Sequence, residues 1–406
     1  MFLYHTLSNG VRIVYKHTDT GVTHSGVYIH VGSRDELRPE EEGIAHFIEH
    51  CIFKGTKRRK AFHILNRIDG VGGELNAFTT KEETCVYAST LTPHFERSIE
   101  LFADILFCST FPEKELERER DVVLEEIDSY KDLPSELIFD EFEELLYFGH
   151  PLSHNILDSK RNVRRFSSSA LQRFVSDNYV PSRMVISVVG GVPFDKVIRV
   201  CERHFGSVSA TQGGKLCRVR PEIKSFNQTV HRRTHQVHAL AGCEAYSAFD
   251  ERKVAFTLLS NLLGGPAMNS RLNMAIRERC GYCYTIESQY TPLSDTGLFT
   301  VYAGIDAGAV DRYVRALMEE LQKMVDTTLT PRQLLAAQRQ LIGQMAVNNE
   351  QCLNEMQAMG KSLLLFDRVD TMEEMQADVL SVTVQEMQSV AADLFREENF
   401  SFLFYV

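Results

Sequence analysis

The chain has 406 residues, which exceeds the usual size of one domain, so we expect two or more domains. Its composition of 44% hydrophobic and 24% charged residues is typical of globular proteins and excludes a disordered chain. The net charge of −11 disfavours a nucleic-acid partner, and the lack of any apolar run near about 18 residues predicts no membrane span.

The N-terminal residues predict a strand that runs into the turn Asn9-Gly10. This segment has neither a basic start nor a long apolar run, so it is unlike a secretory signal peptide. The nine cysteines are an odd number and follow no pattern, which favours free thiols in a reducing compartment. We therefore expect a cytoplasmic location.

The two halves of the sequence repeat one order of elements. In each half a strand, a helix, a strand pair and a second helix precede a proline that opens a further helix. Leu116 and Leu334 hold similar places after these prolines, four and three residues on, at an offset of 218 residues (334 − 116). The first set is expected at 26–31, 41–53, 76–91, 94–108 and after Pro112, and the second at 238–243, 251–263, 284–303, 308–325 and after Pro331.

Both strand pairs are close enough in sequence to form antiparallel hairpins. We therefore predict an α+β fold with two homologous domains, each a largely antiparallel sheet packed with helices on one side. The expected division is an N-terminal domain at 1–206, a linker at 207–226 and a C-terminal domain at 227–406. The linker is assigned because its Ser- and Gly-containing sequence lacks apolar periodicity.

The segment His46-Phe47-Ile48-Glu49-His50 places two histidines one helical turn apart. At about 100° per residue their rings project within about 40° of each other, so both can bind one zinc ion. Glu49 lies at the edge of this face, where a general base can reach a metal-bound water without binding the metal. The alternative is an amphipathic helix with two hydrogen-bonded histidines, since such a pattern arises by accident in roughly one chain in a hundred.

A second predicted helix, at 117–127, is rich in glutamate. Glu119 and Glu126 lie seven residues apart and so project from one face, whereas Glu125 points about 100° away from Glu126. One carboxylate can complete a site of two histidines and one glutamate that keeps a position open for water, and the other can orient a histidine. The alternative is a solvated acidic helix face.

The HxxEH motif followed by Glu126, 76 residues after His50 (126 − 50), resembles the pitrilysin-type (M16) metallopeptidases, which are inverzincins. Within this family, the sequence resembles the small two-domain bacterial members and the mitochondrial processing peptidase β subunit. The resemblance implies one Zn²⁺ per chain, with His46, His50 and Glu126 as ligands, Glu49 as general base and Glu119 as the carboxylate supporting a ligand. Further likeness, over nearly the whole chain, includes Asn9-Gly10, 32–36, 43–45, 53–56, 73–79 and 122–127.

Asn76, Ala77, Phe78 and Thr79 resemble the edge strand that lies beside the metal in this family. The resemblance implies that an extended substrate pairs with this strand by β-augmentation. The alternative is an ordinary strand of a core hairpin.

In the second half, which lacks HxxEH, Arg277 and Tyr284 lie seven residues apart, as in the Arg/Tyr element of the family. The resemblance implies that the arginine holds a substrate carbonyl and the tyrosine donates to the oxyanion. Cys280 stands where the family often has arginine. The alternative is a helix-surface ion pair for Arg277 and a strand beginning at Tyr284.

The resemblance therefore implies a zinc-dependent metalloendopeptidase that cleaves peptides or unfolded polypeptides inside a closed chamber, by attack of a zinc-bound water with Glu49 as base. The chain has length for two domains where larger relatives carry four, so we expect a homodimer, with a heterodimer with a related subunit as the alternative. The rival interpretations are a non-catalytic subunit or peptide-binding protein of the same family, and a structural zinc protein. A structural zinc site is closed, whereas three ligands leave a position open.

Overall fold

The structure, a computed structural model, describes residues 1–157, 159–210, 216 and 218–406. These residues divide into two compact units, each with a segment from the opposite half of the chain. Unit 1 comprises Met1–Asp128, His154–Cys217 and Val347–Thr371, and unit 2 comprises Ser129–Ser153, Arg218–Ala346 and Met372–Val406. Part of the predicted linker, at 211–215 and 217, lies outside the described residues, and its described part contains no helix or strand.

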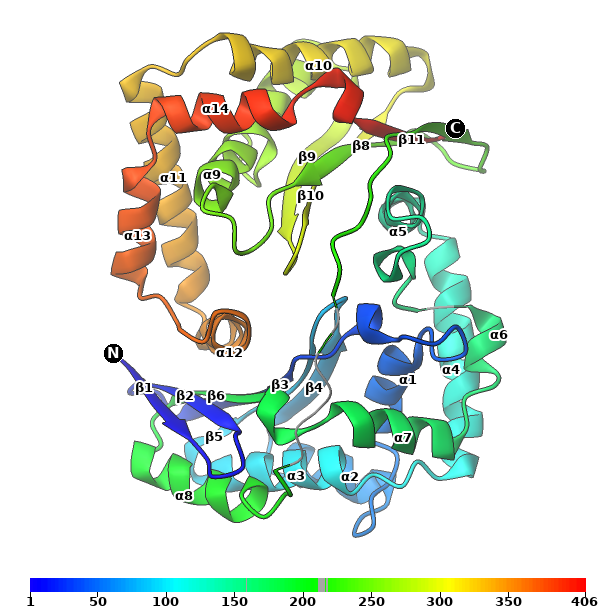
Figure 1. Cartoon of the computed structure of the whole chain (residues 1–406), viewed down its shortest axis with the longest axis vertical. Coiled ribbons are helices and arrows are strands. Elements are labelled where there is room, and N and C mark those ends of the chain that lie inside the picture. Colours follow the sequence, from blue (N-terminus) through cyan, green and yellow to red (C-terminus); the bar gives the residue numbers. More distant parts are fainter. Residues whose placement is uncertain (158, 211–215, 217) are drawn as a thin grey trace. The chain divides into compact units, whose positions relative to one another are not determined.

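Unit 1 contains a six-stranded sheet in the order β1-β2-β6-β3-β5-β4 (Figure 1). All neighbouring strands are antiparallel except β2 and β6, which are parallel. Because β4 is last in this order, one of its two edges pairs with no strand among the described residues. The strands are β1 (Phe2–Thr6), β2 (Arg12–His17), β3 (Val22–Ile29), β4 (Glu74–Thr79), β5 (Thr84–Leu91) and β6 (Met184–Gly190).

The predicted turn at Asn9-Gly10 joins β1 to β2 and is confirmed. Gly10 has a φ of 97°, a left-handed conformation that glycine adopts without steric cost. The side-chain amide of Asn9 is buried and donates to the backbone carbonyl of Phe205, at 2.8 Å. This contact ties the turn to the end of a helix, so the turn is held by more than its own hydrogen bonds.

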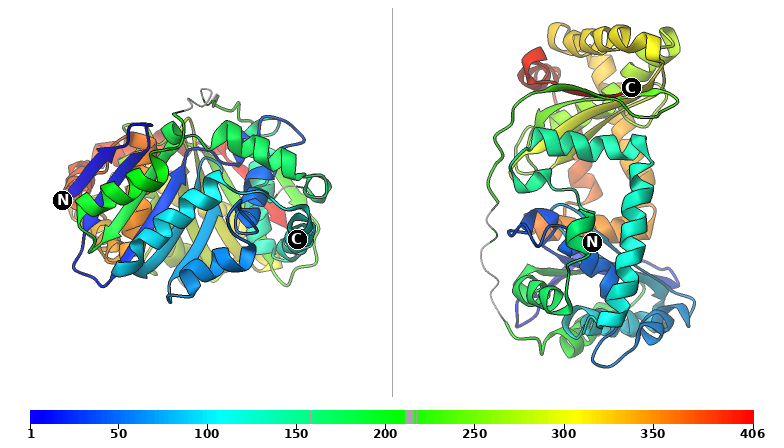
Figure 2. Two further views of the ribbon diagram at one scale, coloured as in Figure 1. Left: turned by 90° about the horizontal axis from the view of Figure 1, so that it is seen from below. Right: turned by 90° about the vertical axis from the view of Figure 1, so that its right-hand side faces the viewer.

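Successive residues of the central strands in unit 1 face two different cores, as expected from the period of two in a strand. Val27 and Ile29 of β3 pack with one set of helices, whereas Tyr28 between them packs against a helix on the other face. The first set of helices is α1 (Ile44–Cys51), α2 (Ala61–Asp69), α3 (Phe95–Phe107), α4 (Glu113–Lys131), α6 (Lys160–Val163), α7 (Ser168–Asn178) and α8 (Phe194–Phe205). Of these, α2, α3 and α8 lie across the sheet in Figure 2 (left).

The second face of this sheet is covered by α12 (Cys352–Phe366), a helix from the other half of the sequence. Gly360 lets α12 approach closely, because a Cβ atom there would lie only 2.3 Å from the ring of Tyr28. Met356 and Met359 fill the same contact with β3 and β6. A segment distant in sequence is therefore part of the core of unit 1.

Unit 2 contains a five-stranded sheet in the order β7-β11-β8-β10-β9, antiparallel except for β7 and β11. The strands are β7 (Asn227–Val230), β8 (Val237–Ala245), β9 (Cys283–Pro292), β10 (Gly297–Ile305) and β11 (Ser401–Tyr405). The helices of this unit are α5 (Pro134–Leu146), α9 (Lys253–Gly264), α10 (Val310–Asp326), α11 (Pro331–Asn349), α13 (Met372–Ser381), α14 (Val384–Leu394) and a π-helix at Asn273–Arg279.

The sheet of unit 2 is also covered on both faces. Phe299 of β10 packs among α9, α10 and α14, whereas Leu298 packs on the opposite face. There Phe142 of α5 fits against Gly242 of β8, where a Cβ atom would lie 2.9 Å from the ring. Helix α5 comes from the first half of the sequence, so the two units mirror each other in this respect.

The predicted α+β fold with two related parts is confirmed. Helices α4 and α11 both have 19 residues, and they begin at the expected prolines, α4 directly after Pro112 and α11 at Pro331. The expectation that helices cover only one side of each sheet is wrong, because α12 and α5 cover the second faces. This exchange was not predicted, since neither helix carries a sequence signal that specifies its partner sheet. Within the described part of the chain, no helix combines the length and apolar character needed to cross a lipid bilayer.

Candidate metal centre

The first element of the site is α1, an eight-residue helix. Its apolar face, including Phe47 and Ile48, is fully buried in the core of unit 1, which leaves the two histidines on another face. Gly43 precedes α1 with a φ of 84° and offers no side-chain cap. The buried carboxylate of Glu36 takes this role and accepts the N–H groups of Gly43 and Ala45 at 2.7 and 2.8 Å.

The second element is α4, which packs through Leu116, Val123 and Ile127. Glu119 and Glu126 project toward α1 from this helix, as their seven-residue spacing predicts. Glu119 is one of the buried residues of α4, although its side chain is charged. The two carboxylates therefore meet the two histidines of α1 from positions about two turns apart on α4.

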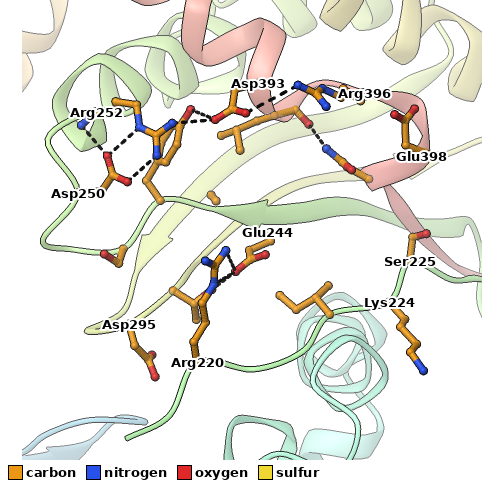
Figure 3. Close-up of a pocket in the computed structure, with 17 residues that line it drawn as sticks. Arg220, Lys224, Ser225, Glu244, Asp250, Arg252, Asp295, Asp393, Arg396 and Glu398 are labelled. Atoms are coloured by element: carbon orange, nitrogen blue, oxygen red, sulfur yellow. Dashed lines mark hydrogen bonds and ion pairs between the residues drawn. The ribbon is translucent and has the colours of Figure 1, made fainter.

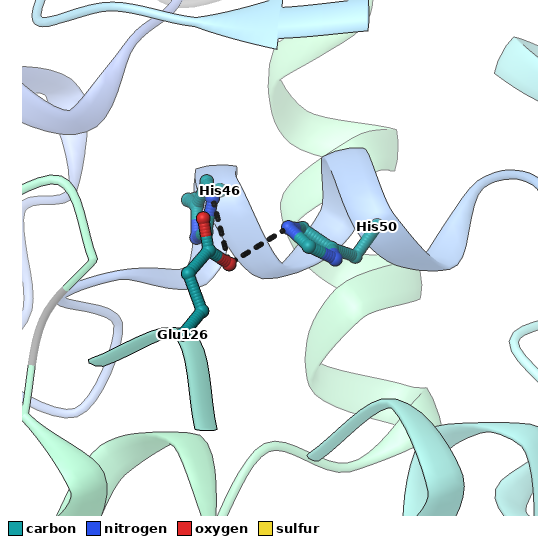
Figure 4. Close-up of side chains that lie close together, drawn as sticks. All are labelled: His46, His50 and Glu126. Carbon is teal, nitrogen blue, oxygen red and sulfur yellow. Dashed lines mark ion pairs between the residues drawn. The ribbon is translucent and has the colours of Figure 1, made fainter. Parts of the chain in front are cut away.

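His46, His50 and Glu126 offer ligand atoms that all lie within 4.8 Å of one another (Figure 4). Glu126 Oε2 is 3.4 Å from the Nε2 atom of His50 and 3.9 Å from that of His46. The two imidazole rings are 4.7 Å apart between centroids and nearly perpendicular, at 70°. Donor atoms around a tetrahedral zinc ion are separated by roughly 3.3 Å, so this group fits zinc after small side-chain adjustments.

An unpartnered atom also indicates that these residues fit a metal ion. Glu126 Oε2 is buried and has no hydrogen-bond partner among the described residues, although the side chain is 42% exposed overall. Buried polar atoms normally have a partner, because leaving one unpaired costs roughly 1–3 kcal/mol. A cation bound between Glu126 and the two histidines would supply that partner.

His50 is oriented from its other side by Glu119, whose Oε1 atom is 3.1 Å from His50 Nδ1. The second carboxylate oxygen of Glu119 lies 2.6 Å from Lys54 Nζ. When the Nδ1–H group of neutral His50 donates a hydrogen bond to Glu119 Oε1, the Nε2 atom has a free lone pair on the side facing Glu126. That is the tautomer a metal ligand needs.

The protonation states of the two histidines differ. Burial lowers the pKa of His46 to about 4, so this ring is neutral at pH 7. Burial also acts to lower the pKa of His50, but its interactions with Glu119 and Glu126 outweigh this effect and raise the pKa to about 9. In the metal-free protein the His50 ring is therefore positively charged at pH 7, with a second proton on Nε2 that a metal ion has to displace.

Glu49 lies on α1 outside the group of three ligands. Burial raises the pKa of its carboxyl group above the ordinary value, while Thr79 of β4 acts in the opposite direction. Helix α1 packs against β4, one of the two edge strands of this sheet among the described residues. The structure thus brings Glu49 and the predicted substrate strand together, with Asn76 exposed and Ala77, Phe78 and Thr79 partly buried.

Arg277 and Tyr284 belong to unit 2, whereas the metal-binding group belongs to unit 1. Arg277 lies in the π-helix, a conformation often found at functional sites, and its Nη1 atom donates to Asn273 Oδ1 at 3.2 Å. It also lies 3.4 Å from Glu278, which is the surface ion pair of the alternative interpretation. Tyr284 is 65% exposed at the start of β9.

Two residues near the site received no role from the sequence, namely Glu36 and Lys54. Glu36 lies in the segment 32–36, and only its contacts with the first turn of α1 reveal that it caps this helix. Lys54 lies in the turn after α1, beyond the helical periodicity that relates His46 to His50, so no spacing in the sequence assigned it to the site.

A separate cavity of about 630 Å³ lies in unit 2 (Figure 3). Its charged groups are largely paired with one another. Arg252 contacts Asp250 and Asp393 at 2.8 and 2.9 Å, and Arg220 contacts Glu244 at 2.9 Å. Because these charges satisfy each other, the cavity does not indicate a particular ligand.

Comparison with known families places the metal-binding group in a defined context. Residues 12–160 match the insulinase family (peptidase family M16), and residues 165–341 match the peptidase M16 inactive domain. His46, His50 and Glu126 lie in the first match, and Arg277 and Tyr284 lie in the second. The chain belongs to peptidase family M16.

Similar proteins agree with this assignment. The uncharacterized zinc protease YmxG of Bacillus subtilis is 34% identical over 399 residues, which cover 98% of this chain and 97% of YmxG. An uncharacterized zinc protease of Streptomyces coelicolor is 32% identical over 397 residues, covering 96% of this chain and 86% of that protein. The crystal structure of a protease from Helicobacter pylori has a TM-score of 0.90 at 25% identity and covers 100% of this chain and 99% of that chain.

A further solved structure shows the fold alone. The peptidase M16 inactive domain from Pseudomonas fluorescens has a TM-score of 0.91 at 18% identity, with coverage of 100% of this chain and 97% of that chain. The fold is thus shared at low sequence identity.

Proposed function

We propose that this protein is a zinc-dependent endopeptidase whose metal ion is held by His46, His50 and Glu126. The observation that carries the proposal is the convergence of these three side chains around the buried, unpartnered Oε2 atom of Glu126. The zinc-protease names of relatives above 30% identity support the choice of metal. When bound, zinc would supply a Lewis acid and lower the pKa of a water at its open position to about 7.

Residues of the chain would then carry out the proton transfers and hold the metal ligands in position. Glu49 would take the proton of the attacking water and pass it to the leaving amine, a role that the raised pKa of its carboxyl group suits. Glu119 would keep His50 in the tautomer that leaves Nε2 free. His46 does not have to lose a proton when it binds zinc, because burial already keeps its ring neutral at pH 7.

The substrate would bind as an extended peptide along β4. Among the described residues, one edge of this strand pairs with no other strand, and the strand packs against α1, where Glu49 is located. Its unpaired backbone groups would hydrogen-bond to the main chain of the substrate, with Asn76, Ala77, Phe78 and Thr79 lining it. Recognition through the main chain favours unfolded or short polypeptides of varied sequence.

Arg277 and Tyr284 would hold the substrate carbonyl and donate to the oxyanion, the roles that the family resemblance implies for them. The exposure of Tyr284 leaves its hydroxyl accessible to a substrate, and Asn273 orients Arg277. The family resemblance adds a closed chamber formed by two chains. Light scattering tests this part: a homodimer of about 92 kDa, twice the 46.2 kDa chain, is expected, and a monomer at micromolar concentration argues against the chamber.

The decisive experiment measures zinc content and cleavage of an unstructured, fluorescence-quenched peptide by the purified protein. We expect one zinc ion per chain, cleavage that stops when a chelator removes the metal, and recovery when zinc is restored. Zinc uptake without cleavage would favour the alternative of a non-catalytic, peptide-binding member of the family. Cleavage that is insensitive to the chelator would contradict the proposal outright.

A further inference from the structure

We propose that Lys54 is a positioning residue of the metal centre, which holds Glu119 in the orientation where it supports His50. This inference rests on the proposed function, because it requires His50 to bind a metal ion. Lys54 would not touch the metal or the substrate and would act only through Glu119.

The carboxylate of Glu119 connects the two side chains. Its Oε1 atom lies 3.1 Å from His50 Nδ1, and its Oε2 atom lies 2.6 Å from Lys54 Nζ. Because each oxygen has a different partner, the plane of the carboxylate is fixed from both sides. Charge-assisted contacts of this kind are shorter and stronger than contacts between neutral groups.

Burial makes the contact with Lys54 hard to replace. The side chain of Glu119 is only 8% exposed, and that of Lys54 is 29% exposed. A buried carboxylate that loses one partner leaves an oxygen unpaired, which is more costly than losing an ion pair at the open surface. Glu119 would then rotate or shift, and the orientation of His50 would loosen with it.

The backbone places Lys54 where this contact is possible. Lys54 lies in the turn after α1, where its N–H group bonds to the carbonyl of Cys51 at 3.1 Å. The next residues are held by short bridges, from Gly55 to Lys60 and from Thr56 to Ser109. One continuous segment thus supplies both histidines and the lysine, and α4 supplies the carboxylates between them.

The competing interpretation is an ordinary ion pair that contributes only to folding, as partly exposed pairs often do. The chain offers a matched control, because Lys16 pairs with Glu355 within the same unit. The exposed fractions of that pair are 31% and 11%, close to those of Lys54 and Glu119. Replacing Lys16 therefore removes a similar pair away from the metal centre.

The experiment compares zinc affinity and urea unfolding for the full chain and the variants Lys54→Met, Lys54→Arg and Lys16→Met. Zinc affinity is measured by competition with a chromogenic chelator of known affinity. We expect Lys54→Met to weaken zinc binding about 10-fold, since loss of a group that supports a ligand typically costs 10- to 100-fold. Lys54→Arg should recover most of this loss, and Lys16→Met should bind zinc like the unmodified protein.

Equal zinc affinities for the unmodified protein and Lys54→Met would overturn this inference alone, as would an equal loss in Lys16→Met. Failure of the unmodified protein to bind zinc would overturn the proposed function and this inference together. Urea unfolding of the metal-free proteins separates folding from positioning, because both methionine variants should shift the midpoint by similar amounts. Only Lys54→Met should also shift the affinity for zinc.

Discussion

Glu126 Oε2 lies 3.4 Å from His50 Nε2, and this buried oxygen has no hydrogen-bond partner among the described residues. The two residues come from different helices, each fixed by its own apolar face in the core of unit 1. The distance between Glu126 and His50 is therefore set by the packing of α1 and α4. One of these side chains can be replaced without disturbing the helix that carries the other.

The variant Glu126→Gln should reduce zinc affinity at least 100-fold, because an amide is a poor zinc ligand and lacks the negative charge. Glu125→Gln is the matched control, since it makes the same change one residue earlier on the exposed side of α4. Both affinities can be measured by chelator competition. An equal loss in the two variants would mean that the general acidity of α4, and not a ligand, is responsible.

The variant Glu49→Gln should retain one zinc ion per chain and lose peptide hydrolysis. The expected loss is about 10²- to 10⁴-fold, the usual contribution of a general base. Metal content by elemental analysis and the rate of peptide cleavage test the two parts separately. A zinc-loaded Glu49→Gln protein that remains active would exclude Glu49 as the base.

Zinc binding should release close to one proton per chain near pH 7. The pKa of metal-free His50 is raised to about 9, so its proton must leave, whereas His46, with a pKa of about 4, is already neutral. Zinc affinity should therefore rise about tenfold per pH unit between about pH 6 and pH 8. Calorimetry in buffers of different ionisation enthalpy measures the number of protons released.

Glu119→Gln provides the control for this pH dependence. Removing the Glu119 charge takes away a group that raises the pKa of His50, so the rise in affinity should level off at a lower pH. Unchanged proton release in this variant would mean that Glu119 does not govern the charge of His50.

Much of the fold followed from local sequence patterns. The strand pair at 76–91 corresponds to β4 and β5, and Pro112 and Pro331 mark the starts of α4 and α11, because alternation and helix-start signals are local. The partner sheets of α5 and α12 could not be predicted in this way. Their apolar faces show that they are buried but do not specify against which strands.

The ligand group was predictable for a similar reason, since the spacing of His46 and His50 and that of Glu119 and Glu126 each follow one helix. That the helix with the histidines lies beside the helix with the glutamates was implied by the family resemblance. The role of Glu36 depends on a loop that returns to the first turn of α1, seven residues before Gly43. Such a loop conformation has no periodic signal in the sequence.

The packing of α12 on the sheet of unit 1 leads to a prediction about glycine. Gly360→Ala should lower the free energy of unfolding by about 1–3 kcal/mol, because the added methyl group meets the ring of Tyr28 at 2.3 Å. Gly343→Ala in α11 should raise it by about 0.5–1 kcal/mol, since nothing lies within 4 Å and alanine favours a helix. Urea unfolding distinguishes the two. If Gly360→Ala proved as stabilising as Gly343→Ala, close contact between α12 and β3 would be ruled out.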